Sequence, residues 1–184
     1  MIKSKHDLEL YLKEDMGFYN AYSDSEKFIL KVLQDPCYHI ARYIRYLRYE
    51  EYYYNTGKNV FEHILYHYYL RKKNMLGNKL GFKIPKNCIG KGLTIYHHGN
   101  VIINESARIG DYCKLHGNNC IGNNGKTEAA PVIGDGLDLG FGAVVIGDVK
   151  LENNITVGAN AVVCNSINGS SVTIVGVPAK PLLR

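Results

Sequence analysis

The chain has 184 residues and a mass of 20.7 kDa; 46% of its residues are hydrophobic, 21% are charged, and the formal net charge is +5. This composition is that of an ordinary soluble globular protein and excludes a collagen, a coiled-coil rod and a disordered tail. No apolar run approaches the ~18 residues of a membrane span, the N-terminal segment lacks the pattern of a secretory signal, and so mild a charge does not indicate nucleic-acid binding.

Tyrosine and glycine divide the chain into two parts. Of the 15 tyrosines, 13 precede Gly77, whereas 15 of the 19 glycines follow Phe82. The five cysteines, an odd number without a close C-x-x-C pair, indicate reduced thiols and a cytoplasmic location. We therefore expect an α-helical N-terminal region at 1–80 and a second domain of different architecture at 81–184.

Four helix starts are predicted in the first part. Each is a polar residue whose side chain can accept a hydrogen bond from the first turn, and apolar residues follow at helical spacing. The expected N-caps are Ser4, Ser23, Asp35 and Asn59, followed by Asp7, Glu26, Pro36 and Glu62, respectively. The last helix is expected to run until Gly77.

The predicted helix that begins at Pro36 interleaves arginine with tyrosine between Arg42 and Tyr54. Such residues could form a membrane-surface or nucleic-acid-binding face, because tyrosine offers stacking area and arginine offers charge. Glu50 and Glu51 interrupt the positive charge, however, and argue against a groove that tracks phosphates. We expect the tyrosines to pack helices together, with no nucleic-acid partner and with peripheral membrane contact only as the second interpretation.

The second part is built on a six-residue repeat. An aliphatic residue recurs at this period and is often followed by glycine, at Ile89, Ile95, Ile103, Ile109, Leu115, Ile121, Ile133, Leu139, Val145, Leu151, Val157 and Val163. This period is typical of a parallel β-helix, in which three hexapeptides form one triangular coil and the aliphatic residues stack inside. About five coils fit between Ile84 and Ile174. The predicted fold class is α+β, with helices followed by a left-handed parallel β-helix.

Two interruptions of the repeat mark candidate functional positions, because an unbroken prism has no pocket. The spacing is eight residues between Ile95 and Ile103, where Tyr96-His97-His98-Gly99-Asn100 lies. It is twelve between Ile121 and Ile133, where the polar loop at 123–130 can project and form the wall of a cleft.

These features resemble the hexapeptide-repeat acyltransferases, specifically the serine acetyltransferase-like group. The similarity covers roughly Ile84 to Pro181 and lies in several segments that agree in order and spacing. They are Gly92-Leu93-Thr94-Ile95-Tyr96-His97-His98-Gly99, Val101-Ile102-Ile103-Asn104, Ala107-Arg108-Ile109-Gly110, Pro131-Val132-Ile133-Gly134-Asp135 and Gly176-Val177-Pro178-Ala179-Lys180.

The resemblance implies an acetyl-CoA-dependent O-acetyltransferase that forms a homotrimer, with acetyl-CoA between neighbouring prisms and no metal. It assigns His97 as the catalytic base that takes the proton of an acceptor hydroxyl, with Glu105 as the nearest matching carboxylate. Tyr96, His98 and His116 are then candidate acceptor-binding residues. The cofactor-binding positions are Gly142, Ala143, Ala161 and Lys180, the last of which suits a CoA phosphate.

The chain departs from true serine acetyltransferases at two places. An aspartate precedes their active histidine, where this chain has Tyr96, and a second active-site histidine preceded by arginine is replaced by Glu128-Ala129-Ala130-Pro131. The segment Gly81-Phe82-Lys83-Ile84-Pro85 resembles the subgroup found in surface-polysaccharide biosynthesis. We therefore expect a sugar hydroxyl or a related polysaccharide precursor as the acceptor, and free serine as the alternative.

Two other classes of protein share this architecture. Gamma-type carbonic anhydrases need three zinc-binding histidines, but no histidine follows His116 in this chain. A non-catalytic β-helix scaffold is the other alternative, against which the interruptions at His97 and Lys126 argue.

Overall fold

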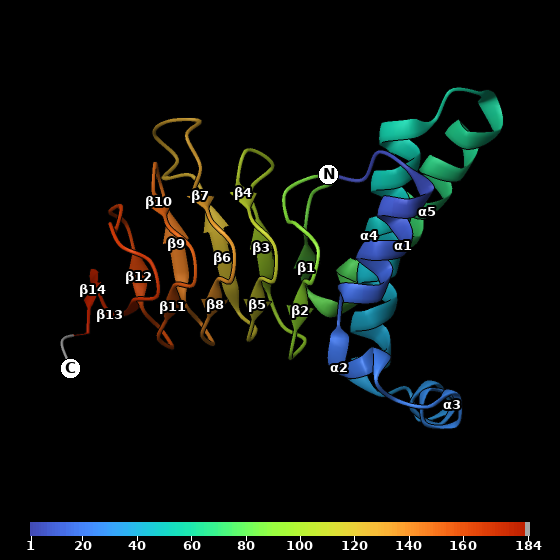
Figure 1. Cartoon of the computed structure of the whole chain (residues 1–184), viewed down its shortest axis with the longest axis horizontal. Coiled ribbons are helices and arrows are strands. Elements are labelled where there is room, and N and C mark those ends of the chain that lie inside the picture. The colour runs from blue at the N-terminus through green and yellow to red at the C-terminus, as the bar shows by residue number, and fades with distance from the viewer. Residues whose placement is uncertain (183–184) are drawn as a thin grey trace.

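The computed structural model describes residues 1–182, in which a group of helices is followed by a column of short strands. Figure 1 shows the helices gathered at one end of an elongated molecule and the strands stacked away from them toward the C-terminus. The helices are α1 (Lys5–Glu14), α2 (Gly17–Asn20), α3 (Asp24–Val32), α4 (Pro36–Thr56) and α5 (Val60–Leu80). The strands are β1 (Phe82–Lys83), β2 (Thr94–Ile95), β3 (Val101–Ile103), β4 (Arg108–Ile109), β5 (Lys114–Leu115), β6 (Asn119–Gly122), β7 (Val132–Ile133), β8 (Asp138–Leu139), β9 (Val144–Ile146), β10 (Lys150–Leu151), β11 (Thr156–Val157), β12 (Val162–Val163), β13 (Thr173–Gly176) and β14 (Ala179–Pro181).

All four predicted helix starts are confirmed. The Ser23 and Glu26 side chains form a complete capping box at α3. The Ser4 side chain accepts a hydrogen bond from the Asp7 amide at α1, and Asp35 and Asn59 cap α4 and α5 in the same way. Local side-chain chemistry therefore determines where these helices begin.

The last helix continues past its predicted end at Gly77 to Leu80. Gly77 lies inside the helix, where glycine permits a close approach of neighbouring atoms. A β-carbon there would lie 2.6 Å from the Phe82 carbonyl oxygen and 3.0 Å from the Tyr43 ring. Gly81 ends the helix instead, with a φ of 79° in the left-handed region that glycine adopts without strain.

The strands form a three-sided prism. Sheet 1 has the order β1-β3-β6-β9-β12, sheet 2 has β10-β7-β4, and sheet 3 has β14-β13-β11-β8-β5-β2. Every pairing between consecutive coils is parallel, and only the β13–β14 pair is antiparallel among the described strands. All twelve aliphatic positions of the predicted repeat are buried, with exposed fractions from 0% to 6%. The six-residue repeat therefore packs the inside of the prism as predicted.

The helices and the prism share one hydrophobic core. Ile40, Ile44 and Leu47 of α4 belong to the same buried cluster as the aliphatic residues of the coils. Tyr43 packs edge-on against Phe82 with 5.2 Å between ring centroids, and its hydroxyl accepts a hydrogen bond from the Ile84 amide. The helical part therefore closes the first coil, whose apolar end would otherwise face water.

The tyrosines pack helices against each other, as expected. Tyr69 of α5 stacks on Tyr49 and Tyr53 of α4, with ring centroids 4.7 Å and 5.7 Å apart. The apolar faces predicted for two helices are not buried within the chain, however. Phe28 of α3 and Leu33 at its C-cap are 63% and 71% exposed, and Phe61 of α5 is 67% exposed. No helix among residues 1–182 is long and apolar enough to cross a membrane.

The five cysteines are free thiols in very different surroundings. Burial raises the pKa of Cys88 to about 11 and that of Cys113 to about 12. Cys164 is exposed. Since the thiolate is the reactive form, the buried thiols are protonated and shielded at pH 8.

We predict that an aromatic disulfide reagent at pH 8 labels Cys164 quickly, whereas Cys88 and Cys113 react only after unfolding. The reaction is followed by absorbance with and without denaturant, and Cys164→Ser serves as the control that removes the fast phase. Rapid labelling of Cys113 in the folded protein would contradict the buried position of this side chain.

Candidate active site on the prism

The predicted histidines lie at the turn that follows β2. Tyr96, His97 and His98 are all exposed there, directly after the buried Ile95. The turn joins sheet 3 to sheet 1, and the equivalent turns follow β5, β8 and β11 in the later coils. We call this edge, formed by residues 96–100, 116–118, 140–143 and 158–161, the His97 corner.

Gly117, in the next coil, lies between His97 and the Phe141 ring. A β-carbon on Gly117 would lie 3.5 Å from the His97 β-carbon and 3.4 Å from the Phe141 ring. Gly117 has a φ of 109°, which a side chain would make unfavourable. Glycine at this position therefore lets the His97 and Phe141 side chains come close to the backbone between them.

Glu105 lies at a different edge of the prism. It follows β3 and precedes β4, so it sits between sheet 1 and sheet 2, whereas His97 sits between sheet 3 and sheet 1. Glu105 is exposed, and its carbonyl oxygen accepts a hydrogen bond from the Arg108 guanidinium. The expected Glu105–His97 pairing is thus not made within one chain.

An imidazole–carboxylate pair is formed instead by His116 and Asp138. The His116 Nε2 lies 2.8 Å from the Asp138 Oδ1, and both side chains are about one-third exposed. His116 follows β5 and lies one coil below Tyr96, as period counting predicts, with 4.7 Å between the two ring centroids. No motif pointed to Asp138, although its outward position between the buried Leu137 and Leu139 places it on the same face.

The helical part also reaches this face. The Phe18 ring of α2 stacks on Tyr96 with ring centroids 5.9 Å apart and planes 12° apart. Phe18 thus extends the pair of rings that Tyr96 and His116 form at the His97 corner. Nothing in the sequence pattern points to Phe18, because the short helix α2 brings it to Tyr96 from a distant part of the chain.

The predicted cofactor positions follow the same edge toward the far end of the prism. Gly142, in the left-handed region with a φ of 72°, and Ala143 lie at the turn after β8, and Ala161 lies at the turn after β11. The side chains of Ala143 and Ala161 are buried, so only the backbone of these residues can face a ligand. Lys180 is exposed on β14, five strands along sheet 3 from β2. That separation is about 24 Å at the usual strand spacing.

The polar loop at 123–130 projects from the prism, but not beside His97. It connects β6 of sheet 1 to β7 of sheet 2, the same edge as Glu105. Asn124 organises it by accepting hydrogen bonds from the amides of Lys126 and Thr127. Within one chain the loop therefore does not form a wall of the His97 site.

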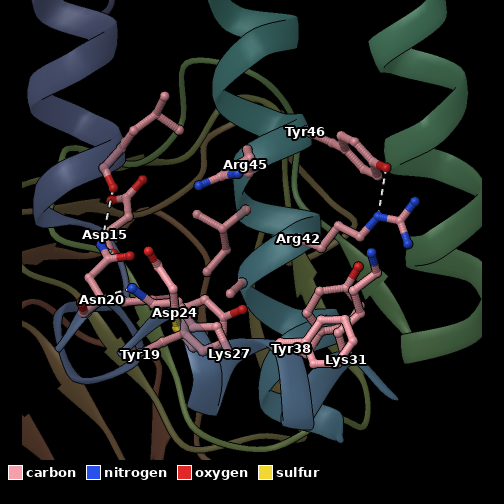
Figure 2. Close-up of a pocket in the computed structure, with 15 residues that line it drawn as sticks. Asp15, Tyr19, Asn20, Asp24, Lys27, Lys31, Tyr38, Arg42, Arg45 and Tyr46 are labelled. Carbon is pink, nitrogen blue, oxygen red and sulfur yellow. Dashed lines mark hydrogen bonds between the residues drawn. The ribbon is translucent and has the colours of Figure 1, made fainter. Parts of the chain in front are cut away.

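A cleft of about 560 Å³ lies in the helical part and contains none of the predicted site residues. Figure 2 shows its charged and aromatic lining, which comes from α2, α3 and α4 and from Asp15 between α1 and α2. Lys27, Lys31, Arg42 and Arg45 line it together with tyrosines, and the Arg42 Nε donates a 2.7 Å hydrogen bond to the Tyr46 hydroxyl. This cleft is separate from the prism face that carries the histidines.

Metal coordination is not indicated in residues 1–182. Within that range no three side chains of histidine, cysteine, aspartate or glutamate gather closely enough to hold a metal ion.

Comparison with known proteins relates the chain to one group of enzymes, although no protein-family model matches it. A serine acetyltransferase of Staphylococcus xylosus is 35% identical over an alignment of 131 residues. The alignment covers 65% of this chain and 60% of that protein. The structure of a Brucella abortus serine acetyltransferase in complex with coenzyme A aligns with a TM-score of 0.68 at 24% identity, over 96% of this chain and 66% of that one. A Neisseria gonorrhoeae serine acetyltransferase in complex with serine aligns with a TM-score of 0.67 at 23% identity, over 98% of this chain and 71% of that one.

These similarities define the fold as α+β, with N-terminal helices followed by the left-handed hexapeptide-repeat β-helix. The homologues by sequence and the neighbours by structure are serine acetyltransferases. The chain spans between 41% and 60% of the length of the curated relatives that it matches. These relatives do not support the sugar acceptor expected from the sequence. They are named serine acetyltransferases, which corresponds to the alternative acceptor, free serine.

Proposed function

We propose that this chain transfers the acetyl group of acetyl-CoA to a hydroxyl group, with L-serine as the acceptor. The observation that carries the proposal is the exposed His97 at an interruption of the β-helix, in a chain whose sequence relatives are serine acetyltransferases. A cytoplasmic location and a homotrimer remain predictions from the sequence.

The chemistry requires a base, because a neutral hydroxyl is a weak nucleophile near neutral pH. We assign this role to His97, whose imidazole takes the hydroxyl proton while the oxygen attacks the thioester carbonyl. The carbon–sulfur bond then breaks, and the proton passes from His97 to the departing CoA sulfur. If Glu105 orients His97, it does so from a neighbouring copy, because the two residues occupy different edges of one prism.

The His97 corner offers an extended path for the co-substrate. Lys180 is assigned to a CoA phosphate, because a flexible lysine is well suited to a phosphate as a point charge. Gly142 and the backbone at Ala143 and Ala161 are assigned to the thiol arm. The acetyl group then lies at the end of the prism nearest the helices, where Tyr96, His98 and His116 surround the acceptor.

The proposal is tested by incubating the full chain with acetyl-CoA and measuring thiol release with L-serine and, separately, with a panel of nucleotide sugars and oligosaccharide fragments. We expect release with L-serine and formation of O-acetylserine by mass spectrometry. Transfer to a sugar but not to L-serine would refute serine as the acceptor and leave the acetyl transfer itself in place. No transfer to any acceptor, together with no CoA binding by calorimetry, would support a non-catalytic scaffold.

A further inference from the structure

His116 is the imidazole on this face whose orientation is fixed by a carboxylate. The hydrogen bond to Asp138 occupies Nε2 at a distance of 2.8 Å. Tyr96 lies against the ring, and Phe18 stacks on Tyr96 in turn. With Nε2 engaged and the ring held by its neighbours, Nδ1 is the nitrogen of His116 that remains for a ligand.

A lysine adds positive charge beside this pair. Lys114 precedes His116 by two residues on the same outward face, and strand register places it opposite Asp138. Lys114 is exposed, and its amine forms no ion pair within 4.0 Å among the described residues. An imidazolium at His116 donates from both ring nitrogens; beside Lys114 it would give two cations against one carboxylate, a combination that favours an anionic ligand group.

Under the proposed function, the acceptor itself supplies an anionic group. An amino-acid acceptor brings a carboxylate to the site, whereas a neutral sugar does not. His116 lies against Tyr96 at the His97 corner, and Lys114 lies on the same sheet, opposite Thr94.

Building on the proposed acetyl transfer, we propose that His116 binds the carboxylate of an amino-acid acceptor through Nδ1, with Asp138 as its positioning residue and Lys114 as a second cation. Asp138 acts through His116 and does not itself touch the acceptor. The three residues then select an acceptor that carries a carboxylate, and His97 performs the proton transfer.

Asp138→Asn tests this assignment by separating binding from chemistry. We expect the KM for L-serine to rise about tenfold, as for loss of a charge-assisted hydrogen bond, with kcat changed less than about twofold. L-Serinamide keeps the hydroxyl and lacks the carboxylate, so its KM is expected to stay unchanged in the variant. His116→Gln should show the same pattern, and Asp148→Asn, on an exposed aspartate elsewhere, serves as the matched control.

Equal increases in KM for L-serine and L-serinamide would overturn the proposal, because the carboxylate would then play no part. A fall in kcat without a change in KM would also overturn it, since His116 would then act in the chemistry. These outcomes concern the acceptor and leave the acetyl transfer itself standing.

A binding readout keeps the inference testable if no acetyl transfer occurs. In long-range 1H–15N spectra of the complex with L-serine, His116 is expected to carry protons on both ring nitrogens, one donated to Asp138 and one to the acceptor carboxylate, and Asp138→Asn should weaken that state. Titration with L-serine should shift the His116 resonances, and L-serinamide should not. Shifts without turnover would refute the proposed function alone, whereas an unresponsive His116 would refute this inference alone.

Discussion

Replacing Arg48 with methionine should lower the free energy of unfolding by about 3–5 kcal/mol, the cost of removing one partner from a buried ion pair. The Arg48 side chain is fully buried, and its guanidinium contacts Asp15 at 2.7 Å and Glu51 at 2.9 Å. It also donates to the carbonyl oxygens of Ile89 and Gly90 in the first coil. Burial opposes the charge, but the two carboxylates more than offset it, so the pKa of Arg48 is raised.

The loss is large because methionine would leave Asp15 and Glu51 buried without their cation. Urea unfolding followed by circular dichroism measures the effect. Arg45→Met is the matched control, since Arg45 is an exposed arginine on the same helix and should change stability by about 0.5 kcal/mol or less. Similar losses in the two variants would show that Arg48 does not join the helices to the prism.

Replacing His97 with alanine should lower the rate of acetyl transfer by about 10²- to 10⁴-fold, the usual contribution of a positioned general base. The side chain is exposed at a turn, so its removal should leave the fold and CoA affinity largely intact. Initial rates of thiol release measure the first expectation, and calorimetry with CoA measures the second.

The control for this variant is His67→Ala, which removes an exposed histidine from α5 and should keep the parent rate. Parent-like activity of His97→Ala would refute the assignment of His97 as the base. In that event His116, the histidine that does have a carboxylate partner, would be the next residue to test.

The parts of the fold that follow from short stretches of sequence could be predicted. A helix cap depends on a few neighbouring residues, as at Ser23 and Glu26, and both the cap and the helix are found where expected. Each hexapeptide likewise carries its own inward residue, so the buried positions of the prism follow from the repeat.

Features that depend on distant contacts could not be predicted. Helical spacing places Arg48 on a face beside the apolar face of its helix, but Asp15 and the first coil enclose the side chain completely. Similarly, the loop at 123–130 lengthens one coil, so the partnership of His116 with Asp138 depends on a register that period counting does not supply.

The exposed apolar residues of α3 and α5 are the clearest disagreement with the sequence pattern. Helical spacing correctly predicted an apolar face, for instance at Phe28 and Phe61, but spacing does not identify what covers that face. Within this chain α4 supplies the helical side chains of the central core, chiefly Ile40, Ile44 and Leu47.

The most direct test of the central claim is a time course of acetyl-CoA and L-serine with the full chain, with CoA thiol and O-acetylserine measured in the same samples. The account predicts that the two products appear in equal amounts and that His97→Ala removes both. Thiol release without O-acetylserine, or no thiol release at all, would contradict acetyl transfer to serine by this chain.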